Sequence, residues 1–506
     1  MFDDGLKPQN DMSIVEGPIS DELWHITIPN LLERTTASAP DQTAVVFHDK
    51  GIRWTYRDLH RMSLQLAAGL LALGVKRGDR VGIWSPNRWE WVAMQYASAQ
   101  IGAILVSINP AYRKAELDYA LNKTGVSVLM MAEAFKSSDY LQMMADLAPE
   151  LEQHIGGPLS LQRFPALKYI IRMGLDQSSG MINTHDVLDL ARDDLIDEAW
   201  RIGKTLNPED PINIQFTSGT TGAPKGATLT HNNIVNNGRF TVNRMGLKAG
   251  EMLCLPVPLY HCFGMVMGSL GCVAIGGGMV LPAEAFEPLS TLAAIEAERC
   301  SALYSVPTMF LAMLDHEMFD RFDLSSLRGG IMAGAPCPME VMRRVTEEMH
   351  LSEITIAYGM TETSPVSFQS HPDDPLEMRV STVGRIHPHV TVKIVNEDGA
   401  AVLPGTQGEL WTKGYSVMHG YWGEEKQTEE SITADGWMRT GDLATIDDNG
   451  FARITGRVKD MVIRGGENIY PREVEEYLYQ HPAVQQAQVF GVPDQKFGEE
   501  LCAYLI

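Results

Sequence analysis

The chain has 506 residues, which is enough for about three domains, and 44% of them are hydrophobic, as in an ordinary globular protein. Lys and Arg total 41 against 64 Asp and Glu; the formal charge of −23 excludes nucleic-acid binding through bulk electrostatics. No apolar run reaches the ~18 residues of a membrane span. The acidic start Met1–Gly5 lacks the features of a signal peptide. The six cysteines contain no Cys-x-x-Cys pair, which predicts free thiols in a reducing compartment. We therefore expect a cytoplasmic protein.

The first part of the chain alternates between helical and extended patterns. Apolar residues at helical spacing predict helices over 59–73, 89–100 and 114–122. Short apolar runs predict strands over 80–84, 103–106 and 126–131. Helices between short strands are typical of βαβ units on a parallel sheet.

A second series begins near Pro211. Its predicted strands are 212–216, 253–257, 279–281, 301–306, 329–335 and 354–357, with a predicted helix over 232–240. Ligands of such sheets bind just beyond the carboxyl ends of strands. The loop 217–225 and the turn 334–336 fall at two of these ends.

From about residue 380 the pattern changes to short strands, predicted over 390–395, 408–412 and 451–454 and separated by turn residues, which favours a small β-barrel or sheet. A helix over 473–480 and strands over 484–490 and 502–506 follow. We therefore predict an α/β fold. Its large domain, 1–458, contains α/β subdomains over about 30–200 and 201–379 and a β subdomain over 380–458, and a small α+β domain follows over 459–506, incomplete here.

The most informative segment is a loop rich in glycine and hydroxyl residues. It consists of Thr217, Ser218, Gly219, Thr220, Thr221, Gly222, Ala223, Pro224 and Lys225. The glycines let backbone N–H groups approach anionic oxygens, the hydroxyls add donors, and the lysine adds positive charge, which together suit a polyphosphate. The spacing differs from a Walker A loop. A polar hairpin turn is the alternative.

A second segment runs from Tyr358 through Gly359 and Met360 to Thr361 and Glu362, after a predicted strand. The tyrosine ring could stack on a purine, the threonine could bond a phosphate oxygen, and the glutamate could hold Mg²⁺. Taken singly, each residue is an ordinary surface or core residue. Taken together, they predict a nucleotide site.

Three weaker signals follow the same logic. Asp442, after a glycine, could accept two hydrogen bonds from a ribose diol, or it is an ordinary turn residue. Arg457 could bond ribose or phosphate, and Gly465 with Gly466 allows close backbone approach to a ligand; a solvated charged loop is the alternative. His261 stands among aromatic residues, as a core histidine or as one that meets a carboxylate at a pocket mouth.

The segments 217–225, 358–362, 436–442, 456–460 and 464–471, in this order, resemble the acyl-adenylate-forming superfamily, which contains acyl-CoA synthetases, beetle luciferases and peptide-synthetase adenylation domains. The resemblance extends from about residue 30 to the end of the chain. Within the superfamily, the residues 358–365 and 380–385 resemble the medium-chain fatty acyl-CoA ligases, including acyl-CoA synthetase family member 2.

The resemblance implies a role for each position. Thr217 to Lys225 would hold the β- and γ-phosphates of ATP, Thr361 would touch the α-phosphate, and Glu362 would ligate Mg²⁺. Other residues would contact the remaining groups: Gly334, Ala335, Pro336, Tyr358, Gly359 and Met360 the adenine and its surroundings, Asp442 and Arg457 the ribose, His261 the acid carboxylate beside the pantetheine path, and Arg464, Gly465 and Gly466 the CoA channel. Lys459 would be the hinge of a mobile small domain, and Lys225, Thr361, Glu362 and His261 would act in catalysis.

The implied function is an ATP-dependent acid:CoA ligase that forms an acyl-AMP from a carboxylic acid, expected to be a medium-chain fatty acid, with release of pyrophosphate, and passes the acyl group to CoA. Alternatives are an aryl or small thioether acid, another acceptor, or an ATP-binding protein without catalysis. The resemblance also implies a catalytic lysine near the end of the small domain, and no matching segment precedes Ile506. Oligomeric state is left open, with a homodimer as one option. The acid pocket is expected among Met265, Val266, Met332, Met360 and Val366, with ordinary core packing as the alternative for each of them.

Overall fold

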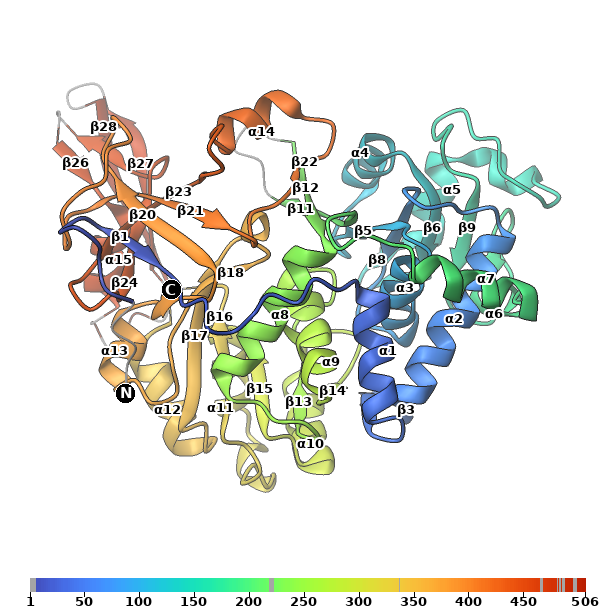
Figure 1. The fold of residues 1–506 in the computed structure, drawn as a ribbon, viewed down its shortest axis with the longest axis horizontal. Coiled ribbons are helices and arrows are strands. Elements are labelled where there is room, and N and C mark those ends of the chain that lie inside the picture. Colours follow the sequence, from blue (N-terminus) through green and yellow to red (C-terminus); the bar gives the residue numbers. More distant parts are fainter. Residues whose placement is uncertain are drawn as a thin grey trace.

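A computed structural model describes residues 6–217, 223–335, 337–464, 467–479, 481, 484, 487–494 and 498–506. Two large, mostly parallel sheets with their helices form the right and centre of the molecule in Figure 1, and antiparallel sheets form its left side. The predicted α/β class is confirmed. Within the described residues, no helix is both long and apolar enough to cross a membrane.

The first large sheet has eight strands. In sheet order they are β10 (Ile182–Asn183), β9 (Tyr169–Arg172), β6 (Val126–Met131), β4 (Arg80–Trp84), β5 (Ile104–Ile108), β11 (Pro211–Thr217), β12 (Lys225–Thr230) and β22 (Gly420–Tyr421). The strands from β10 to β11 are parallel, whereas β12 returns antiparallel to β11 and β22 runs antiparallel to β12. The two ends of the glycine-rich loop therefore lie on neighbouring strands.

The second large sheet has nine strands. In sheet order they are β19 (Arg385–Ile386), β18 (Val366–Gln369), β17 (Glu353–Gly359), β16 (Gly329–Ala333), β15 (Ala302–Ser305), β13 (Met252–Cys254), β14 (Gly278–Leu281), β2 (Thr43–Phe47) and β3 (Ile52–Thr55). The strands from β17 to β2 are parallel, with antiparallel strands at both edges. The carboxyl ends of β16 and β17 are neighbours, because the two strands pair in parallel.

The two remaining sheets of at least four strands are antiparallel. One consists of β1 (Ile14–Glu16), β20 (Val390–Val395), β21 (Gly408–Gly414), β23 (Met438–Ile446) and β24 (Ala452–Arg457) in this order. The other consists of β26 (Glu467–Ile469), β25 (Val462–Arg464), β28 (Gly498–Leu505) and β27 (Ala487–Asp494). A two-stranded ribbon, β7 (Ala134–Phe135) and β8 (Ser138–Asp139), lies apart from them.

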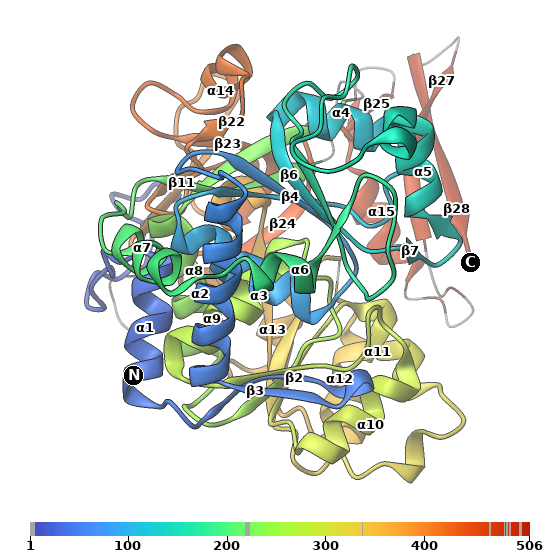
Figure 2. The ribbon, with the colours of Figure 1, turned by 90° about the vertical axis from the view of Figure 1, so that its right-hand side faces the viewer.

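Helices fill the space between and around the sheets. They are α1 (Ile28–Ser38), α2 (Tyr56–Ala72), α3 (Trp89–Gln100), α4 (Lys114–Thr124), α5 (Tyr140–Leu147), α6 (Thr184–Asp189), α7 (Asp193–Gly203), α8 (His231–Met245), α9 (Gly271–Ile275), α10 (Pro288–Glu298), α11 (Pro307–Leu314), α12 (Met339–Glu348), α13 (Leu376–Ser381), α14 (Glu425–Ser431) and α15 (Pro471–Leu478). A π-helix, Phe263–Leu270, precedes α9. Figure 2 shows α1, α2 and α7 together on one outer side.

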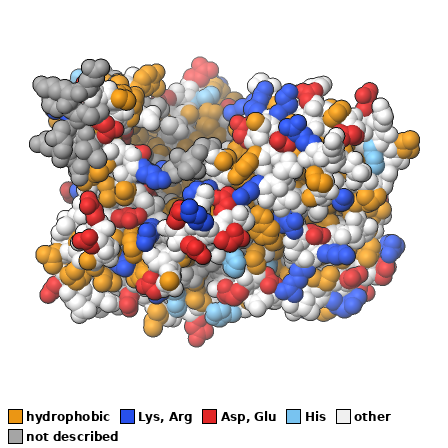
Figure 3. Space-filling model, turned by 90° about the horizontal axis from the view of Figure 1, so that it is seen from above, with side chains coloured by type: hydrophobic (Ala, Val, Ile, Leu, Met, Phe, Trp, Pro, Cys, Tyr) orange, Lys and Arg blue, Asp and Glu red, His pale blue; other side chains and the backbone are white. Residues whose placement is uncertain are grey.

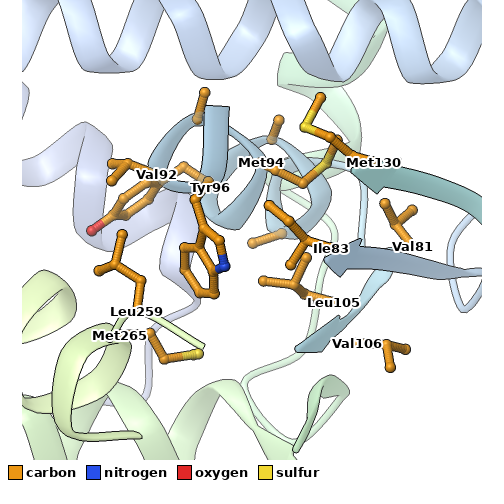
Figure 4. Packing of buried hydrophobic residues seen from close by; sticks show 14 of the residues in the cluster. Val81, Ile83, Val92, Met94, Tyr96, Leu105, Val106, Met130, Leu259 and Met265 are labelled. Atoms are coloured by element: carbon orange, nitrogen blue, oxygen red, sulfur yellow. The ribbon is translucent and has the colours of Figure 1, made fainter. Parts of the chain in front are cut away.

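Helix α3 is central to the core. Every residue from 90 to 100 is buried, as expected for a helix enclosed on all sides. Figure 4 shows Val92 and Tyr96 of this helix on the side of Leu259 and Met265, which come from the other half of the molecule, and Ile83 of β4 on the other side of the view. All of these side chains are buried and belong to one hydrophobic cluster, so α3 joins the two large sheets into one core.

The N-terminal segment ties the antiparallel sheet to the large core. Strand β1 pairs with β20, and the chain then crosses α8 to reach α1, as Figure 1 shows in dark blue. At the crossing, the Asn236 side chain of α8 accepts a hydrogen bond from Trp24 N–H (2.8 Å) and donates one to Trp24 C=O (3.1 Å). The Trp24 ring lies between the guanidinium groups of Arg34 and Arg239.

Several predicted elements match their observed bounds, and others differ for identifiable reasons. The helix 89–100 and the strands 80–84, 126–131 and 390–395 have the predicted bounds. Strand β13 ends at Cys254 rather than at residue 257, since Pro256 has no N–H to donate. The grouping into two consecutive series is not followed by the sheets: β2 and β3 join the second sheet, and β11 joins the first. The domain bounds stay predictions.

On the face seen from above, basic and acidic side chains are interspersed (Figure 3). The excess of acidic residues is therefore not gathered into one patch on this face. This mixture is the usual arrangement of a soluble protein surface.

Candidate active site

The buried carboxylate of Glu362 is the centre of the candidate site. It lies in a 3-10 turn, Thr361–Thr363, directly after β17. Gly359 at the end of this strand lets the chain turn back on itself, because a Cβ there would lie 1.7 Å from the Pro365 carbonyl oxygen. Glu362 is only 5% exposed. The local backbone thus directs a carboxylate inward at the carboxyl end of a central strand.

Two hydroxyl groups hold Glu362. Thr217, the last residue of β11, donates to its Oε1 (3.2 Å), and Tyr421 of β22 donates to the same oxygen (2.9 Å). Lys225, the first residue of β12, places its ammonium 4.8 Å from the centre of the Tyr421 ring, in cation–π contact. One end of the glycine-rich loop, Thr217, therefore contacts Glu362 directly, and the other end, Lys225, contacts Tyr421, which bonds Glu362. Glu362 itself follows a strand of the other large sheet.

Tyr421 is a site residue that the sequence analysis missed. It follows Gly420 in a short strand that pairs with β12, which brings it beside Lys225. Burial, followed by the adjacent Glu362, raises the pKa of the Tyr421 phenol, so it stays a protonated donor. Its glycine–aromatic sequence is too common to have identified it, because the contact depends on pairing between distant strands.

A second buried carboxylate, Asp442, belongs to β23 and contacts β17 at Tyr358, just before the turn that holds Glu362. Asp442 is 8% exposed and accepts a hydrogen bond from the Tyr358 hydroxyl (2.5 Å) and one from Arg457 Nε (3.2 Å). Gly441, at φ +72°, provides the turn that precedes it. Asp442 and Arg457 are direct partners in the ladder between β23 and β24. These three predicted residues are thus in direct contact.

The charges of this second group follow from its surroundings. Burial raises the pKa of Asp442, and the Tyr358 hydroxyl and the Arg457 guanidinium oppose that rise. Burial and the neighbouring Asp442 raise the pKa of Tyr358, which therefore remains a donor. The Arg457 side chain is exposed and can reach a ligand without leaving this group.

Other predicted residues adjoin these contacts or lie apart from them. Gly334 and Ala335 follow β16 and are exposed; the register pairs Ala333 with Ala357, which puts the turn beside Tyr358. Ala223 and Pro224 lie just before β12. Arg464 is away from this group, in the four-stranded sheet, where its Nε bonds Glu500 (2.6 Å). Lys459 is exposed in the loop between β24 and β25. Ser218, Gly219, Thr220, Thr221, Gly222, Pro336, Gly465 and Gly466 lie outside the described residues.

His261 stands at the entrance to the π-helix. Its Nδ1 accepts a hydrogen bond from the Phe263 N–H (3.2 Å), so the neutral ring carries its proton on Nε2. The side chain is exposed, and the adjacent Cys262 is buried, with Sγ 3.1 Å from Gln215 Oε1 on β11. Gln215 is two residues before Thr217. A short path of contacts therefore links His261 to the Glu362 group.

The expected acid pocket needs one correction. Met265, Val266 and Val366 are buried in the cluster around α3, with Met360 partly buried against it. Met332, however, lies in the other cluster, with Val341 and Met349. Successive side chains of a strand point to opposite faces, so Met332 of β16 points away from its neighbours Ile331 and Ala333. The prediction for Met332 was therefore wrong.

The surroundings of Glu362 suit a cation that is bound jointly by this carboxylate and by a ligand, rather than by protein side chains alone. Within the described residues, no three His, Cys, Asp or Glu side chains are grouped as metal ligands. Both hydroxyl donors use Oε1 of Glu362, which leaves Oε2 without such a donor among the described residues. Mg²⁺ commonly binds to one or two carboxylate oxygens and to phosphate oxygens. The residues present fit that mode.

Comparison with known proteins identifies the family. Residues 32–422 match the family described as AMP-binding enzyme, and residues 473–506 match the AMP-binding enzyme C-terminal domain. The chain belongs to the AMP-binding enzyme family. The resemblance noted from the sequence is thereby confirmed.

Two relatives are similar over nearly the whole chain. YngI of Bacillus subtilis (strain 168), which carries a provisional acyl-CoA synthetase name, is 48% identical over 486 residues, covering 96% of this chain and 88% of that protein. The Homo sapiens protein named medium-chain acyl-CoA ligase ACSF2, mitochondrial, is 42% identical over 501 residues, covering 98% and 82%.

Solved structures of the same kind share the fold. The anthranilate CoA ligase AuaEII in complex with anthranoyl-AMP has a TM-score of 0.82 at 25% identity, covering 95% of this chain and 87% of that chain. ATP-bound MatB from Rhodopseudomonas palustris has a TM-score of 0.78 at 26% identity, covering 94% and 88%.

Proposed function

We propose that this enzyme is an ATP-dependent acid:CoA ligase, with a medium-chain fatty acid as the substrate. The observation that carries the proposal is the meeting of two contact groups at the end of β17. One joins Thr217, Glu362 and Tyr421, and the other joins Tyr358, Asp442 and Arg457. Their spacing along β17 supports a nucleotide with phosphates at one end and ribose at the other.

The first step needs positioning and charge stabilisation more than a protein nucleophile. A carboxylate oxygen of the acid attacks the α-phosphorus of ATP, the bond to pyrophosphate breaks, and acyl-AMP forms. Thr361 and Lys225 would bond the phosphate oxygens, Asp442 would accept from the ribose hydroxyls, and Tyr358 would cover the adenine. Groups fixed in advance lower the barrier because they need not reorganise during the reaction.

Magnesium fits this site at Glu362. Together with phosphate oxygens, its carboxylate would hold Mg²⁺, which neutralises the charge of the triphosphate when bound. Thr217 and Tyr421 hold one oxygen of that carboxylate, Oε1, by hydrogen bonds.

The second step transfers the acyl group. The CoA thiol attacks the carbonyl carbon of acyl-AMP, the bond to the AMP oxygen breaks, and the thiol proton passes to solvent. His261, exposed at the edge of the site, would lie between the acid carboxylate and the pantetheine. We propose further that the small domain turns about Lys459 between the steps and brings Arg464, Gly465 and Gly466 to the CoA channel.

The test follows both products. Purified protein with ATP, Mg²⁺ and saturated acids of increasing length should release pyrophosphate and then form acyl-CoA, with a maximum at medium length. Lys225→Ala should abolish acid-dependent pyrophosphate release while the protein stays folded. Full activity in this variant would contradict the site.

Two alternatives give different results in the same assay. Another acceptor or acid predicts pyrophosphate release without acyl-CoA, or a preference for aryl or thioether acids. An ATP-binding protein without catalysis predicts ATP binding with no acyl-AMP trapped by hydroxylamine.

The cytoplasmic location and the homodimer remain predictions, to be checked by fractionation and by light scattering.

A further inference from the structure

Asn87 bridges the two halves of the molecule. It lies between β4 and α3, in the first large sheet's layer, and is 5% exposed. Its backbone N–H donates to the Glu284 carbonyl (2.9 Å). Its side-chain Nδ2 donates to the Val257 carbonyl (3.0 Å), and its Oδ1 accepts from the Leu259 N–H (2.8 Å). Because one partner is a carbonyl and the other an N–H, the orientation of the amide is unambiguous.

The two side-chain bonds enclose Pro258. This proline begins the turn that leads into the π-helix, and its carbonyl oxygen faces both the His261 N–H (3.4 Å) and Gly264. A Cβ on Gly264 would lie 2.3 Å from that oxygen, so glycine is required for the close approach. The Pro258 turn is thus held between the Asn87 side chain and Gly264 of the π-helix.

The Pro258 turn and the first turn of the π-helix together hold His261. The His261 carbonyl accepts from Gly264 N–H and from Met265 N–H, each at 3.0 Å, while its Nδ1 accepts from Phe263 N–H. Both the backbone and the ring of His261 are therefore bound to the first turn of the π-helix. The loop that holds Asn87 has its own anchor, because Arg88 forms two hydrogen bonds to Glu133 (2.8 and 2.9 Å).

We infer that Asn87 is a positioning residue for the acid end of the active site: it fixes the Pro258 turn, and through that turn it sets the place of His261 and the carboxylate that His261 meets. This inference rests on the proposed function. It assigns to the Asn87 side chain a role that is separate from ATP binding, because its bonds reach residues 257–259 and not the residues around Glu362 or Asp442.

The chain offers a matched control in Asn236. This residue is also a buried asparagine, and it also holds a distant backbone segment through one accepted and one donated hydrogen bond, at Trp24. Both variants to alanine lose a pair of hydrogen bonds to a distant backbone segment, and Asn236→Ala also loses two bonds to Asn232. Both should therefore lower thermal stability, Asn236→Ala by at least as much as Asn87→Ala. They differ in the segment that is released.

The experiment compares two probes on the full chain by calorimetry: AMP, and octanoyl sulfamoyl adenosine, a stable analogue of octanoyl-AMP. In Asn87→Ala, we expect affinity for the analogue to fall by about tenfold or more and affinity for AMP to stay within about twofold, since a small displacement of a site group weakens only its own contacts. Asn236→Ala should keep both affinities. Asn87→Ser, whose hydroxyl adds no charge and can donate or accept one hydrogen bond, should lie between wild type and Asn87→Ala and covers the case in which the alanine variant does not fold.

The outcomes separate this inference from the proposed function. Equal losses for AMP and the analogue in Asn87→Ala or Asn87→Ser, or no loss for either probe, would overturn the positioning role while the wild-type protein still binds both probes. Failure of the wild-type protein to bind AMP or the analogue would instead overturn the proposed function.

Discussion

Two buried carboxylates, Glu362 and Asp442, lie near the end of one strand and have different partners. Glu362 accepts hydrogen bonds from two neutral hydroxyl groups. Asp442 accepts from one neutral hydroxyl group and from the Arg457 guanidinium, which also balances its charge. Within the described residues, no ion pair is recorded for Glu362.

The difference indicates different ligands for the two groups. A buried carboxylate whose donors are all neutral has no opposite charge beside it, and a bound cation would supply one. A carboxylate already paired with arginine gains little from a cation, and its oxygens are suited to accept hydroxyl donors. The comparison therefore assigns the metal end of the site to Glu362 and the ribose end to Asp442. The predictions below test this division.

The largest effect is expected for Glu362→Gln, which keeps the shape of the side chain and removes its charge. We expect acid-dependent pyrophosphate release to fall by about 10²–10³-fold, as when a group that stabilises transition-state charge is lost. The measurement is a coupled pyrophosphate assay across a range of Mg²⁺ concentrations. Glu429→Gln makes the same chemical change on exposed α14 and should behave as wild type. Wild-type activity in Glu362→Gln would refute the metal role.

Glu90 provides a third buried carboxyl, for which burial is the dominant influence. Burial raises its pKa from 4.5 to about 7. Because the folded pKa exceeds the unfolded one, the stabilisation is complete below pH 4.5 and is lost as pH rises through 7. The gap corresponds to about 3 kcal/mol. At pH 8.5, Glu90→Gln should therefore have its unfolding midpoint at a higher urea concentration than wild type, and at pH 4.5 the two midpoints should nearly coincide. An equal difference between the two proteins at both pH values would contradict this.

Asp442→Asn should have a smaller effect, confined to the nucleotide. The asparagine keeps one acceptor oxygen and loses the charge that strengthens its hydrogen bonds, so we expect the KM for ATP to rise by about tenfold. The Mg²⁺ dependence of the reaction should stay as in wild type. A shifted Mg²⁺ dependence in this variant would remove the distinction between the two carboxylates.

The smallest effect is expected for Tyr421→Phe. The ring below Lys225 remains, and only the neutral hydrogen bond to Glu362 is lost, which corresponds to a decrease of about two- to tenfold in kcat/KM. Tyr421→Leu should lose more, because the cation–π contact with Lys225 is removed as well. If both variants had equal activity, the ring would have no role.

Some of this arrangement was predictable from the sequence, for physical reasons. Helix α3 and strand β6 have long, regular apolar patterns, and their bounds were predicted correctly. Tyr358, Asp442 and Arg457 occur in short segments of specific composition, and the structure brings them into contact. Local patterns suffice where the chain itself supplies most of the determining interactions.

The rest depends on contacts between distant parts of the chain. Strand β11 looked like the start of a second series, yet it pairs with β5 of the first sheet. Tyr421 and Asn87 lie in segments without an unusual composition, and only strand pairing or a bond across about 170 residues gives them a role. Met332 was misplaced because the face of a strand depends on its register.

The most direct test is a crystal structure with Mn²⁺, which replaces Mg²⁺, and a non-hydrolysable ATP analogue. The account predicts an anomalous manganese peak bonded to Glu362 and to phosphate oxygens, with the ribose on Asp442 and the adenine beside Tyr358. A nucleotide bound elsewhere, or a manganese ion on Asp442 and away from Glu362, would contradict it.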